Sequence, residues 1–305
     1  VFDMMELTIL GCHSATPREH KHTTSQLLEV QGNLFLIDCG EGTQIQLRKS
    51  KAKFSRIQHI FISHLHGDHF YGLIGLISSF RLLGRTAPLN VYGPKGIKEI
   101  ITLQLKLAKS WTDYPLHFHE LSSSKSQILF EDDRVSVVTL PLIHRVYTNG
   151  FLFTSKTLKR KINTAAVKDL NLADYQYRQL QQGQSITLAD GRSFENKALT
   201  LTPELPKKYA YCSDTTYHES LIPHIEKVDL LYHESTFLEK HADLAEKTMH
   251  STALQAAKIA KAAGVKRLLL GHYSNRYTDK VEFKAEAKTI FDAVYLSEDL
   301  KTFSV

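Results

Sequence analysis

The residues best suited to chemistry in this chain lie in the stretch 64–69, which reads HLHGDH. Three imidazoles and a carboxylate this close would crowd one another in a core, whereas a bound zinc ion would give each of them a partner. His64 and His66 point the same way if the backbone stays extended, which suits one metal ion. Asp68 and His69 come after a glycine, where the chain can turn, and so can face a second metal ion.

The HLHGDH stretch follows an apolar run that predicts a β-strand over residues 57–62. Loops that leave the end of a strand are where a rigid scaffold presents reactive side chains. Later strands are predicted over residues 135–140, 208–212, 228–232 and 267–270. Each of them is also followed by a polar residue, namely His144, Asp214, Glu234 and His272. Strand ends that converge on one edge would bring these residues to the HLHGDH stretch.

Each of the later residues, taken alone, is weak evidence for a metal site. A single histidine such as His144 or His272 is more often an ordinary polar residue than a metal ligand, and Asp214 could cap a following helix. Together with the HLHGDH stretch they complete the ligand set that a pair of tetrahedral or five-coordinate zinc ions requires. The alternative interpretation of the stretch is a solvated histidine-rich loop.

Composition places the chain among ordinary globular proteins. It has 305 residues, of which 42% are hydrophobic and 23% charged. No apolar run approaches the roughly 20 residues of a membrane-spanning helix, and residues 1–10 lack the pattern of a signal peptide. Cys12, Cys39 and Cys212 are too scattered for a disulfide framework and favour buried free thiols. We therefore expect no membrane partner and a cytoplasmic location.

A polar segment interrupts the alternation of predicted strands and helices. Between residues 156 and 182 six basic residues stand against two acidic ones, while the whole chain carries a net charge of +6. The basic residues are Lys156, Lys159, Arg160, Lys161, Lys168 and Arg178. One interpretation is a solvated pair of surface helices. The other is an arm inserted at residues 155–184 that binds the phosphates of a nucleic acid.

Several motifs resemble those of the metallo-β-lactamase-fold hydrolases. They are residues 35–44 (FLIDCGEGTQ), residues 63–69 with Gly72 and Leu73, His144, residues 213–215 (SDT) and residues 271–274 (GHYS). Within that superfamily, residues 233–237 (HESTF) and 250–252 (HST) resemble a paired signature of ribonuclease Z, the tRNA 3′-processing endonuclease. The likeness extends over nearly the whole chain, and the Glu234 and His250 pair narrows it to this family.

The resemblance implies a fold and a metal site. The fold is a four-layer αββα sandwich made by a single domain over residues 1–305, with a substrate-binding arm inserted at 155–184. The ligands of one Zn²⁺ ion would be His64, His66 and His144. Those of a second Zn²⁺ ion would be Asp68, His69 and His272, with Asp214 bridging the two ions.

The resemblance also implies a reaction. Two divalent ions roughly 3.5–4 Å apart lower the pKa of a shared water and clamp the phosphoryl oxygens of an in-line displacement. Asp68 would accept the proton of that water, and His250, oriented by Glu234, would donate a proton to the leaving ribose oxygen. The implied substrate is precursor tRNA, from which the enzyme removes the 3′ trailer. The implied assembly is a homodimer, with the arm of one subunit near the active site of the other.

Other functions are open at this point. The same fold and metals could serve a hydrolase of small phosphodiesters, aryl sulfates or lactones, although the basic arm and the Glu234 and His250 pair favour RNA. A non-catalytic RNA-binding protein with a degenerate site is disfavoured, because the ligand set is complete. A flavin-associated oxygen reductase is disfavoured, because no flavin-binding domain is attached.

Overall fold

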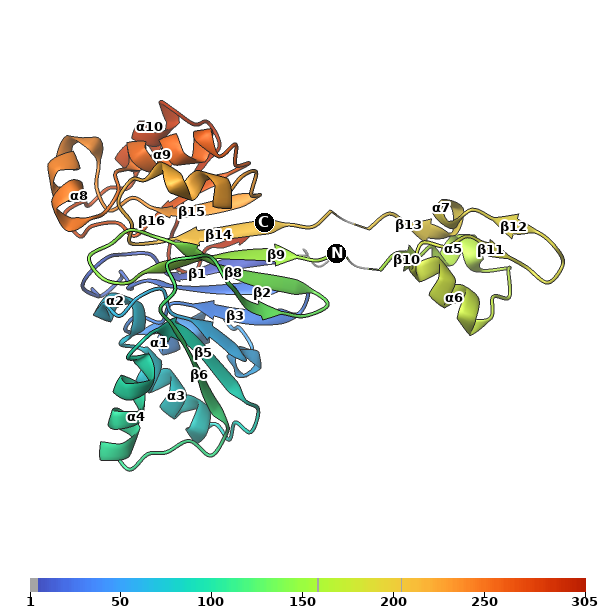
Figure 1. The fold of residues 1–305 in the computed structure, drawn as a ribbon, viewed down its shortest axis with the longest axis horizontal. Coiled ribbons are helices and arrows are strands. Elements are labelled where there is room, and N and C mark those ends of the chain that lie inside the picture. The colour runs from blue at the N-terminus through green and yellow to red at the C-terminus, as the bar shows by residue number, and fades with distance from the viewer. Residues whose placement is uncertain (1–4, 158, 204) are drawn as a thin grey trace. The chain divides into compact units, whose positions relative to one another are not determined.

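The computed structural model of the chain describes residues 5–157, 159–203 and 205–305. Contacts divide the chain into two compact units, which Figure 1 shows as ribbons. The larger unit extends to Thr154 and resumes at Lys207, and the smaller unit spans Ser155–Pro206. All of the predicted metal ligands lie in the larger unit, and all of the predicted RNA-binding residues lie in the smaller one.

The first sheet of the larger unit contains the N-terminal strands. Its seven strands lie in the order β18-β1-β2-β3-β4-β5-β6. Their bounds are β18 (Thr302–Ser304), β1 (Met5–Gly11), β2 (Ser25–Val30), β3 (Asn33–Ile37), β4 (His59–Phe61), β5 (Leu89–Pro94) and β6 (Leu116–Leu121). Neighbouring strands run parallel from β3 to β6 and antiparallel from β18 to β3.

The second sheet contains the remaining long strands. Its order is β17-β16-β15-β14-β9-β8-β7. The bounds are β17 (Val294–Leu296), β16 (Leu268–Gly271), β15 (Leu230–Glu234), β14 (Lys208–Cys212), β9 (Asn149–Ser155), β8 (Val135–Pro141) and β7 (Ile128–Glu131). The strands from β14 to β17 run parallel, so the chain leaves each of them at the same edge of the sheet.

Helices cover the outer face of each sheet (Figure 1). Beside the first sheet lie α1 (Thr43–Lys49), α2 (Gly67–Phe70), α3 (Leu73–Leu82) and α4 (Ile97–Leu107). Beside the second lie α8 (Ala242–Thr248), α9 (Ala253–Ala262) and α10 (Val281–Lys288). Short 3₁₀ helices occur at η1 (Phe54–Arg56), η2 (Glu219–His224) and η3 (Glu239–His241). The predicted four-layer αββα arrangement is confirmed.

Strand β3 shows how the sequence builds these layers. Phe35 and Ile37 belong to the core between the two sheets, whereas Leu34 and Leu36 belong to the core between the first sheet and its helices. Because successive side chains of a strand point to opposite faces, a strand covered on both faces must be apolar throughout. The ring of Phe35 lies 5.5 Å from that of Phe153 in β9, so the two sheets are in contact.

Helix α9 begins with a side-chain cap. Both Ser251 and Thr252 are residue types that commonly cap a helix, and the capping residue is Thr252. Its hydroxyl accepts a hydrogen bond from the Gln255 backbone N–H at 3.1 Å. The Ser251 hydroxyl is turned inward and donates to the Thr215 carbonyl at 2.7 Å. The helix ends before Gly264, whose φ of 61° is typical of a glycine that follows a helix.

The smaller unit has its own small core. Strand β10 (Lys161–Ile162) pairs with β13 (Thr200–Leu201), and β11 (Ile186–Thr187) pairs with β12 (Ser193–Phe194). The helices are α5 (Thr164–Val167), α6 (Asp174–Gln181) and α7 (Asn196–Leu199). The hydrophobic residues buried in this core are Val167, Leu180, Ile186 and Leu199. Since β13 and α7 take part in this packing, the unit continues beyond residue 184, where the sequence analysis ended the arm, to Pro206.

Candidate metal centre

The first ligand cluster combines the loop after β4 with the loop between β8 and β9. His64 Nε2 lies 2.9 Å from His66 Nδ1, and His144 Nε2 lies 3.4 Å from the same His66 atom. Asp214, which follows β14, places its Oδ2 atom 3.5 Å from His64 Nε2 and 3.8 Å from His144 Nε2. One donor atom from each of these residues therefore lies within 4.8 Å of the others.

The second cluster lies on the other side of Asp214. His69 Nε2 and His272 Nε2 are 3.3 Å apart, and Asp68 Oδ2 lies 3.7 Å from the first and 3.5 Å from the second. The remaining Asp214 oxygen, Oδ1, lies 3.1 Å from both imidazole nitrogens. Asp214 thus offers one oxygen to each cluster. The structure brings together every residue that the sequence predicted as a ligand.

Hydrogen bonds on the far side of the imidazole rings fix their orientation. His69 Nδ1 donates to Asp38 Oδ2 at 2.7 Å, and His144 Nδ1 donates to the Met249 carbonyl at 2.9 Å. Each of these bonds uses the ring nitrogen that points away from the cluster and leaves Nε2 directed into it, which is the orientation that a metal-binding imidazole needs. Such partners are common around metal-binding histidines.

Asp38 contacts the His69 imidazole, and its spacing alone did not mark it as a site residue. Besides His69, its carboxylate accepts hydrogen bonds from the Ser63 backbone N–H at 2.7 Å and from the Ser63 hydroxyl at 2.8 Å. The Tyr211 hydroxyl donates to it at 2.5 Å. Asp38 directly follows strand β3, as Asp214 follows β14. Its place at a strand end is the signal that could have identified it.

Glu234 and His250 form a buried pair beside the second cluster. Glu234 Oε1 accepts hydrogen bonds from His250 Nδ1 at 2.7 Å and from the Thr215 backbone N–H at 2.9 Å. Its Oε2 accepts from the Thr236 hydroxyl at 2.6 Å. That hydroxyl lies 2.8 Å from His272 Nδ1, which donates to it. Glu234 therefore orients His250 directly and His272 through Thr236, a residue that the sequence analysis also missed.

The pKa values of this pair favour an ion pair. Burial opposes charge on both groups, but attraction to His250 outweighs it and lowers the pKa of Glu234 to about 2. Attraction to Glu234 likewise overcomes burial and raises the pKa of His250 to about 9. For Asp214 burial again acts against charge, and the nearby imidazoles of His272 and His69 hold its pKa well below the usual range.

The backbone around the clusters is held in an unfavourable conformation. Ala15, Asp38, Asp214 and His272 have φ values of 66°, 55°, 60° and 60°. Each such non-glycine residue costs about 1–3 kcal/mol and persists where its surroundings determine it, which is typical of functional sites. The Ala15 N–H donates to Asp68 Oδ2 at 2.7 Å, so one of these strained residues positions a candidate ligand.

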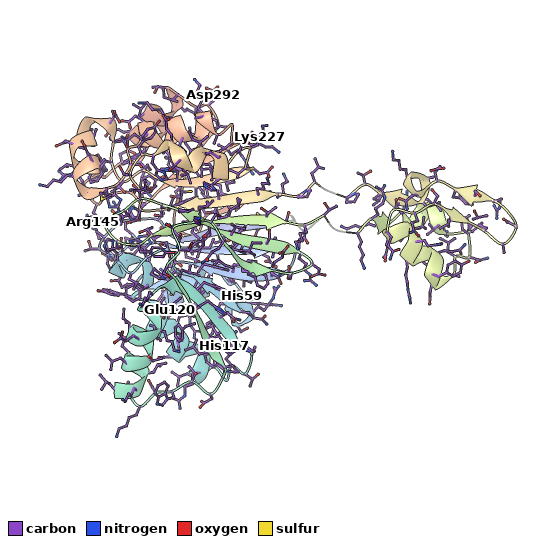
Figure 2. All side chains as sticks on the ribbon, in the orientation of Figure 1. His59, His117, Glu120, Arg145, Lys227 and Asp292 are labelled. Carbon is purple, nitrogen blue, oxygen red and sulfur yellow. The ribbon has the colours of Figure 1, made fainter. Side chains whose placement is uncertain are left out.

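A cavity of about 270 Å³ opens onto the clusters. The residues that line it include His66, Asp68, Arg145, Asp214, His250 and His272. Arg145 is exposed at the surface of the larger unit (Figure 2). The candidate site therefore combines metal-binding donors, a protonated histidine and a guanidinium group around one opening.

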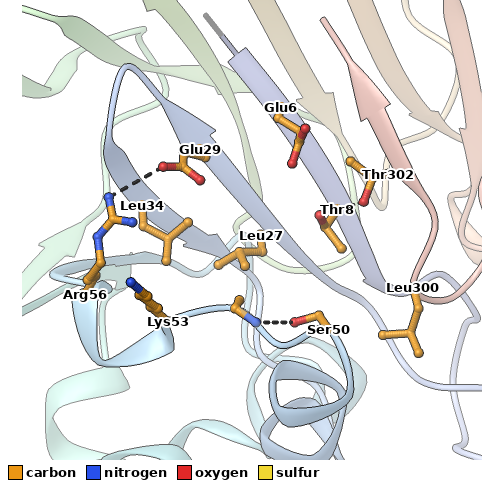
Figure 3. Close-up of a pocket in the computed structure, with 11 residues that line it drawn as sticks. Glu6, Thr8, Leu27, Glu29, Leu34, Ser50, Lys53, Arg56, Leu300 and Thr302 are labelled. Carbon is orange, nitrogen blue, oxygen red and sulfur yellow. Dashed lines mark hydrogen bonds and ion pairs between the residues drawn. The ribbon is translucent and has the colours of Figure 1, made fainter. Parts of the chain in front are cut away.

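A hollow elsewhere on the larger unit differs in character. Figure 3 shows it beside β1 and β2, where an ion pair joins Arg56 and Glu29 at 3.5 Å. None of the described residues that line it is a predicted site residue. Cys12, His13 and Asp299 also bring donor atoms close together, but Lys280 Nζ lies 3.7 Å from Cys12 Sγ and would repel a cation.

The residues predicted to bind RNA are mostly accessible. Lys159, Lys161, Lys168 and Arg178 are exposed, and Lys156 and Arg160 are half-buried. Arg160 also has a structural task, because its Nε donates to the Thr200 hydroxyl at 2.7 Å next to strand β10. The smaller unit thus presents several cations to solvent.

The donor set fits zinc. Its atoms are imidazole nitrogens and carboxylate oxygens, which are common zinc ligands in proteins. They lie close enough to share one ion in each cluster, and most of the residues are buried. So many buried imidazoles and carboxylates would be costly without a partner. The arrangement supports two metal sites with one shared carboxylate.

Comparisons with known proteins show similarity along the whole chain. Residues 5–112 match the family model described as Anti-Pycsar protein Apyc1. The ribonuclease Z of Bacteroides fragilis is 43% identical over 297 residues, which cover 97% of this chain and 98% of that protein. The short form of human tRNase Z has a TM-score of 0.71 and 27% identity, with 98% of this chain and 99% of that one covered.

A second solved structure supports the fold alone. The metallo-β-lactamase-fold protein YhfI of Bacillus subtilis has a TM-score of 0.70 at 21% identity, with 99% of each chain covered. In the part of the chain that the structure describes, no helix is both long and apolar enough to span a membrane.

Proposed function

The chain belongs to the ribonuclease Z family of metallo-β-lactamase-fold hydrolases, and we propose that it removes the 3′ trailer of precursor tRNA with the help of two Zn²⁺ ions. The family membership makes it an endoribonuclease that processes the 3′ end of tRNA. The observation that carries the metal proposal is the position of Asp214, whose two oxygens face two separate groups of ligands.

The proposed ligands follow from the two clusters. His64, His66 and His144 would hold one ion, and Asp68, His69 and His272 the other, with Asp214 shared between them. When bound, such ions lower the pKa of a shared water and neutralise charge on the phosphoryl oxygens. Asp38, Thr236 and the Met249 carbonyl would keep the imidazoles oriented for this role.

Asp68 is proposed as the acceptor of the proton from the attacking water. Its side chain is 11% exposed and reaches the cavity. The Ala15 N–H fixes its Oδ2 atom, and attraction to the imidazoles of His69 and His272 outweighs burial and holds its pKa well below the usual range. A carboxylate that is ionised and held in place can orient a water and take its proton.

His250 is proposed as the donor of a proton to the leaving ribose oxygen. Its Nδ1 is occupied by Glu234, so Nε2 is the nitrogen that can donate. The side chain is 11% exposed and lines the cavity. Because its pKa is about 9, the imidazole carries the required proton at neutral pH.

The smaller unit is proposed as the arm that binds the tRNA. Its exposed cations would contact phosphates, which give affinity without reading the base sequence. Lys156, Lys159, Arg160, Lys161, Lys168 and Arg178 are the residues proposed for this contact. A cytoplasmic location fits this substrate and is part of the proposal.

The homodimer is proposed as well. Leu103 and Leu107 on α4 and the nearby Trp111 are 51%, 74% and 53% exposed, and this apolar surface supports an interface with a second copy. Light scattering should then give twice the chain mass of 34.7 kDa. A mass equal to that of one chain would contradict the dimer.

The test of the proposed function is direct. The purified protein is incubated with a 3′-extended precursor tRNA, with and without a chelator, and the ends of the products are mapped. We expect one cut at the 3′ side of the mature tRNA that the chelator abolishes and added Zn²⁺ restores. Intact precursor in every sample would contradict the proposal.

A further inference from the structure

A second cavity lies next to the one that opens onto the metal clusters. Its volume is about 500 Å³, within the range of roughly 300–1,000 Å³ typical of small-ligand sites. Its walls include Ser122, Ser123, Ser124, Ile143, Val146 and His218. Arg145 lines both cavities, and His144 lines this one while its imidazole belongs to the first metal cluster. The two cavities are therefore neighbours that share one charged side chain.

The loop that separates the cavities is rigidly held. Its Ile143 N–H donates to the Thr215 hydroxyl at 3.2 Å, and the Ile143 carbonyl accepts from the Thr216 N–H at 2.9 Å. At its other end the Tyr147 hydroxyl donates to the Ser123 carbonyl at 2.9 Å. The loop is thus tied to the segment after β14 on one side and to the serine segment on the other, so its backbone is anchored at both ends.

Those outward side chains have the character of a nucleotide site. Ile143 and Val146 are 43% and 41% exposed, which provides apolar surface for a base or sugar. Ser122 and Ser124 line the same cavity and are exposed, so their hydroxyls can donate and accept hydrogen bonds. Among the described residues, Arg145 has no hydrogen bond or salt bridge to another side chain, which leaves its guanidinium ready for a phosphate.

We propose that this second cavity binds the base and sugar of a nucleotide adjacent to the scissile phosphate, and that Arg145 binds a phosphate next to it. The proposal rests on the proposed function and names a subsite of the same active site. An RNA strand that passes from the metal clusters across Arg145 enters this cavity directly. A nucleotide supplies the combination that the walls require, with an apolar face, polar edges and a negative charge.

The test uses precursor tRNAs that lack the base on one side or the other of the cleavage position. For the wild-type protein we expect one of the two abasic substrates to lose roughly tenfold in kcat/KM, a typical loss for a base contact. Ser124→Trp, which fills the cavity, should lower kcat/KM on the intact substrate and show no further loss with the abasic one. Val146→Asp, which places a carboxylate in the wall, should behave in the same way.

The controls separate this subsite from the rest of the enzyme. Both variants should hydrolyse bis(p-nitrophenyl) phosphate like the wild type, because that substrate needs no base site. Ser55→Trp, at an exposed position of η1, should cleave all RNA substrates like the wild type. The subsite would be overturned if both cavity variants still lost as much kcat/KM on the abasic substrate as the wild type does. It would also be overturned if the wild type cleaved both abasic substrates as well as the intact one. Failure of the wild type to cut any precursor tRNA would instead overturn the proposed function and the subsite with it.

Arg145 has its own test. Arg145→Gln should raise KM for precursor tRNA. It should also reduce the slope of log KM against log salt concentration by about 1, the change expected when one phosphate contact is lost. Arg48→Gln, at an exposed position of α1, serves as the matched control and should leave the slope unchanged. An unchanged slope in Arg145→Gln would contradict its contact with a phosphate.

Discussion

At the scale of single residues, the candidate metal site depends on the ligands and also on the residues that orient them through hydrogen bonds. The HLHGDH stretch and the polar residues after later strands could be found from the sequence, because their types and spacing suit a metal directly. Asp38 could have been noticed by its place at a strand end, but neither its partner nor that of Thr236 could be predicted. Their role depends on which imidazole the fold places beside them, and no local spacing encodes that partner.

The variant Asp38→Asn tests whether the residues behind the ligands contribute to metal binding. Asp38 accepts hydrogen bonds from His69, from Ser63 and from Tyr211, and an amide would replace one acceptor oxygen by a donor. We expect zinc affinity to fall by roughly 10- to 100-fold, measured with a competing chelator. Asp133→Asn, on a side chain that is 89% exposed, is the control and should bind zinc normally. Normal affinity in Asp38→Asn would contradict the orienting role.

His250→Ala tests the proposed proton donor. Loss of a general acid typically slows a reaction by roughly 100- to 10,000-fold, so kcat on precursor tRNA should fall within that range. Zinc content should stay near that of the wild type, since His250 is not among the proposed ligands. A variant that loses metal together with activity would show that His250 acts as a ligand instead.

At the scale of elements, periodicity predicts the middle of each helix and strand better than its ends. The apolar run at 57–62 suggests a longer strand than β4, which pairs with its neighbours over His59–Phe61. The ends depend on nonlocal pairing. In the smaller unit, too, nonlocal pairing sets the bounds of a strand. Strand β13 at residues 200–201 pairs with β10 at residues 161–162, which lies far away in the sequence.

The cap of helix α9 gives a test of stability. Thr252→Ala removes the hydroxyl that accepts from the Gln255 N–H and donates to Glu239 at 2.7 Å. We expect a loss of about 1 kcal/mol in the free energy of unfolding, measured with denaturant. Gln104→Ala, at an exposed position of α4, is the control and should change stability by less than about 0.5 kcal/mol. Equal stability of both variants would argue against the cap.

His59 in β4 provides a dependence on pH. Burial lowers its pKa to about 4, whereas an unfolded histidine has a pKa of about 6.5. The unfolded chain therefore takes up this proton first, and stability falls as the pH drops from about 6.5 towards 4. The melting temperature of the metal-free protein should decline less over this range in His59→Gln than in the wild type.

The matched control for this effect is His117→Gln, on the exposed side of β6. Figure 2 labels both histidines on the larger unit. The control should follow the pH dependence of the wild type. Identical curves for His59→Gln and the wild type would show that His59 takes up its proton equally in both states.

At the scale of the whole molecule, the basic segment can be removed cleanly. Strands β9 and β14 pair antiparallel, with Thr154 opposite Lys208, so a tight Asn-Gly turn can replace residues 156–206. We expect this deletion to abolish cleavage of precursor tRNA and to spare hydrolysis of a small phosphodiester. Equal loss of both activities would contradict a separate role in RNA binding.

The overall sandwich was predictable from the sequence because its motifs resemble those of the metallo-β-lactamase-fold hydrolases. The extent of the smaller unit was harder to predict, because residues 185–206 lack the excess of basic side chains that marks residues 156–182. Their place in the unit comes from packing, as with Leu199 against the core of the arm.

The metal content of the purified protein tests the central claim most directly. The two clusters that share Asp214 predict two zinc ions per chain by elemental analysis after careful preparation, and a marked loss of zinc in Asp214→Ala. A wild-type chain that holds less than one zinc ion, and gains none on titration, would contradict the account.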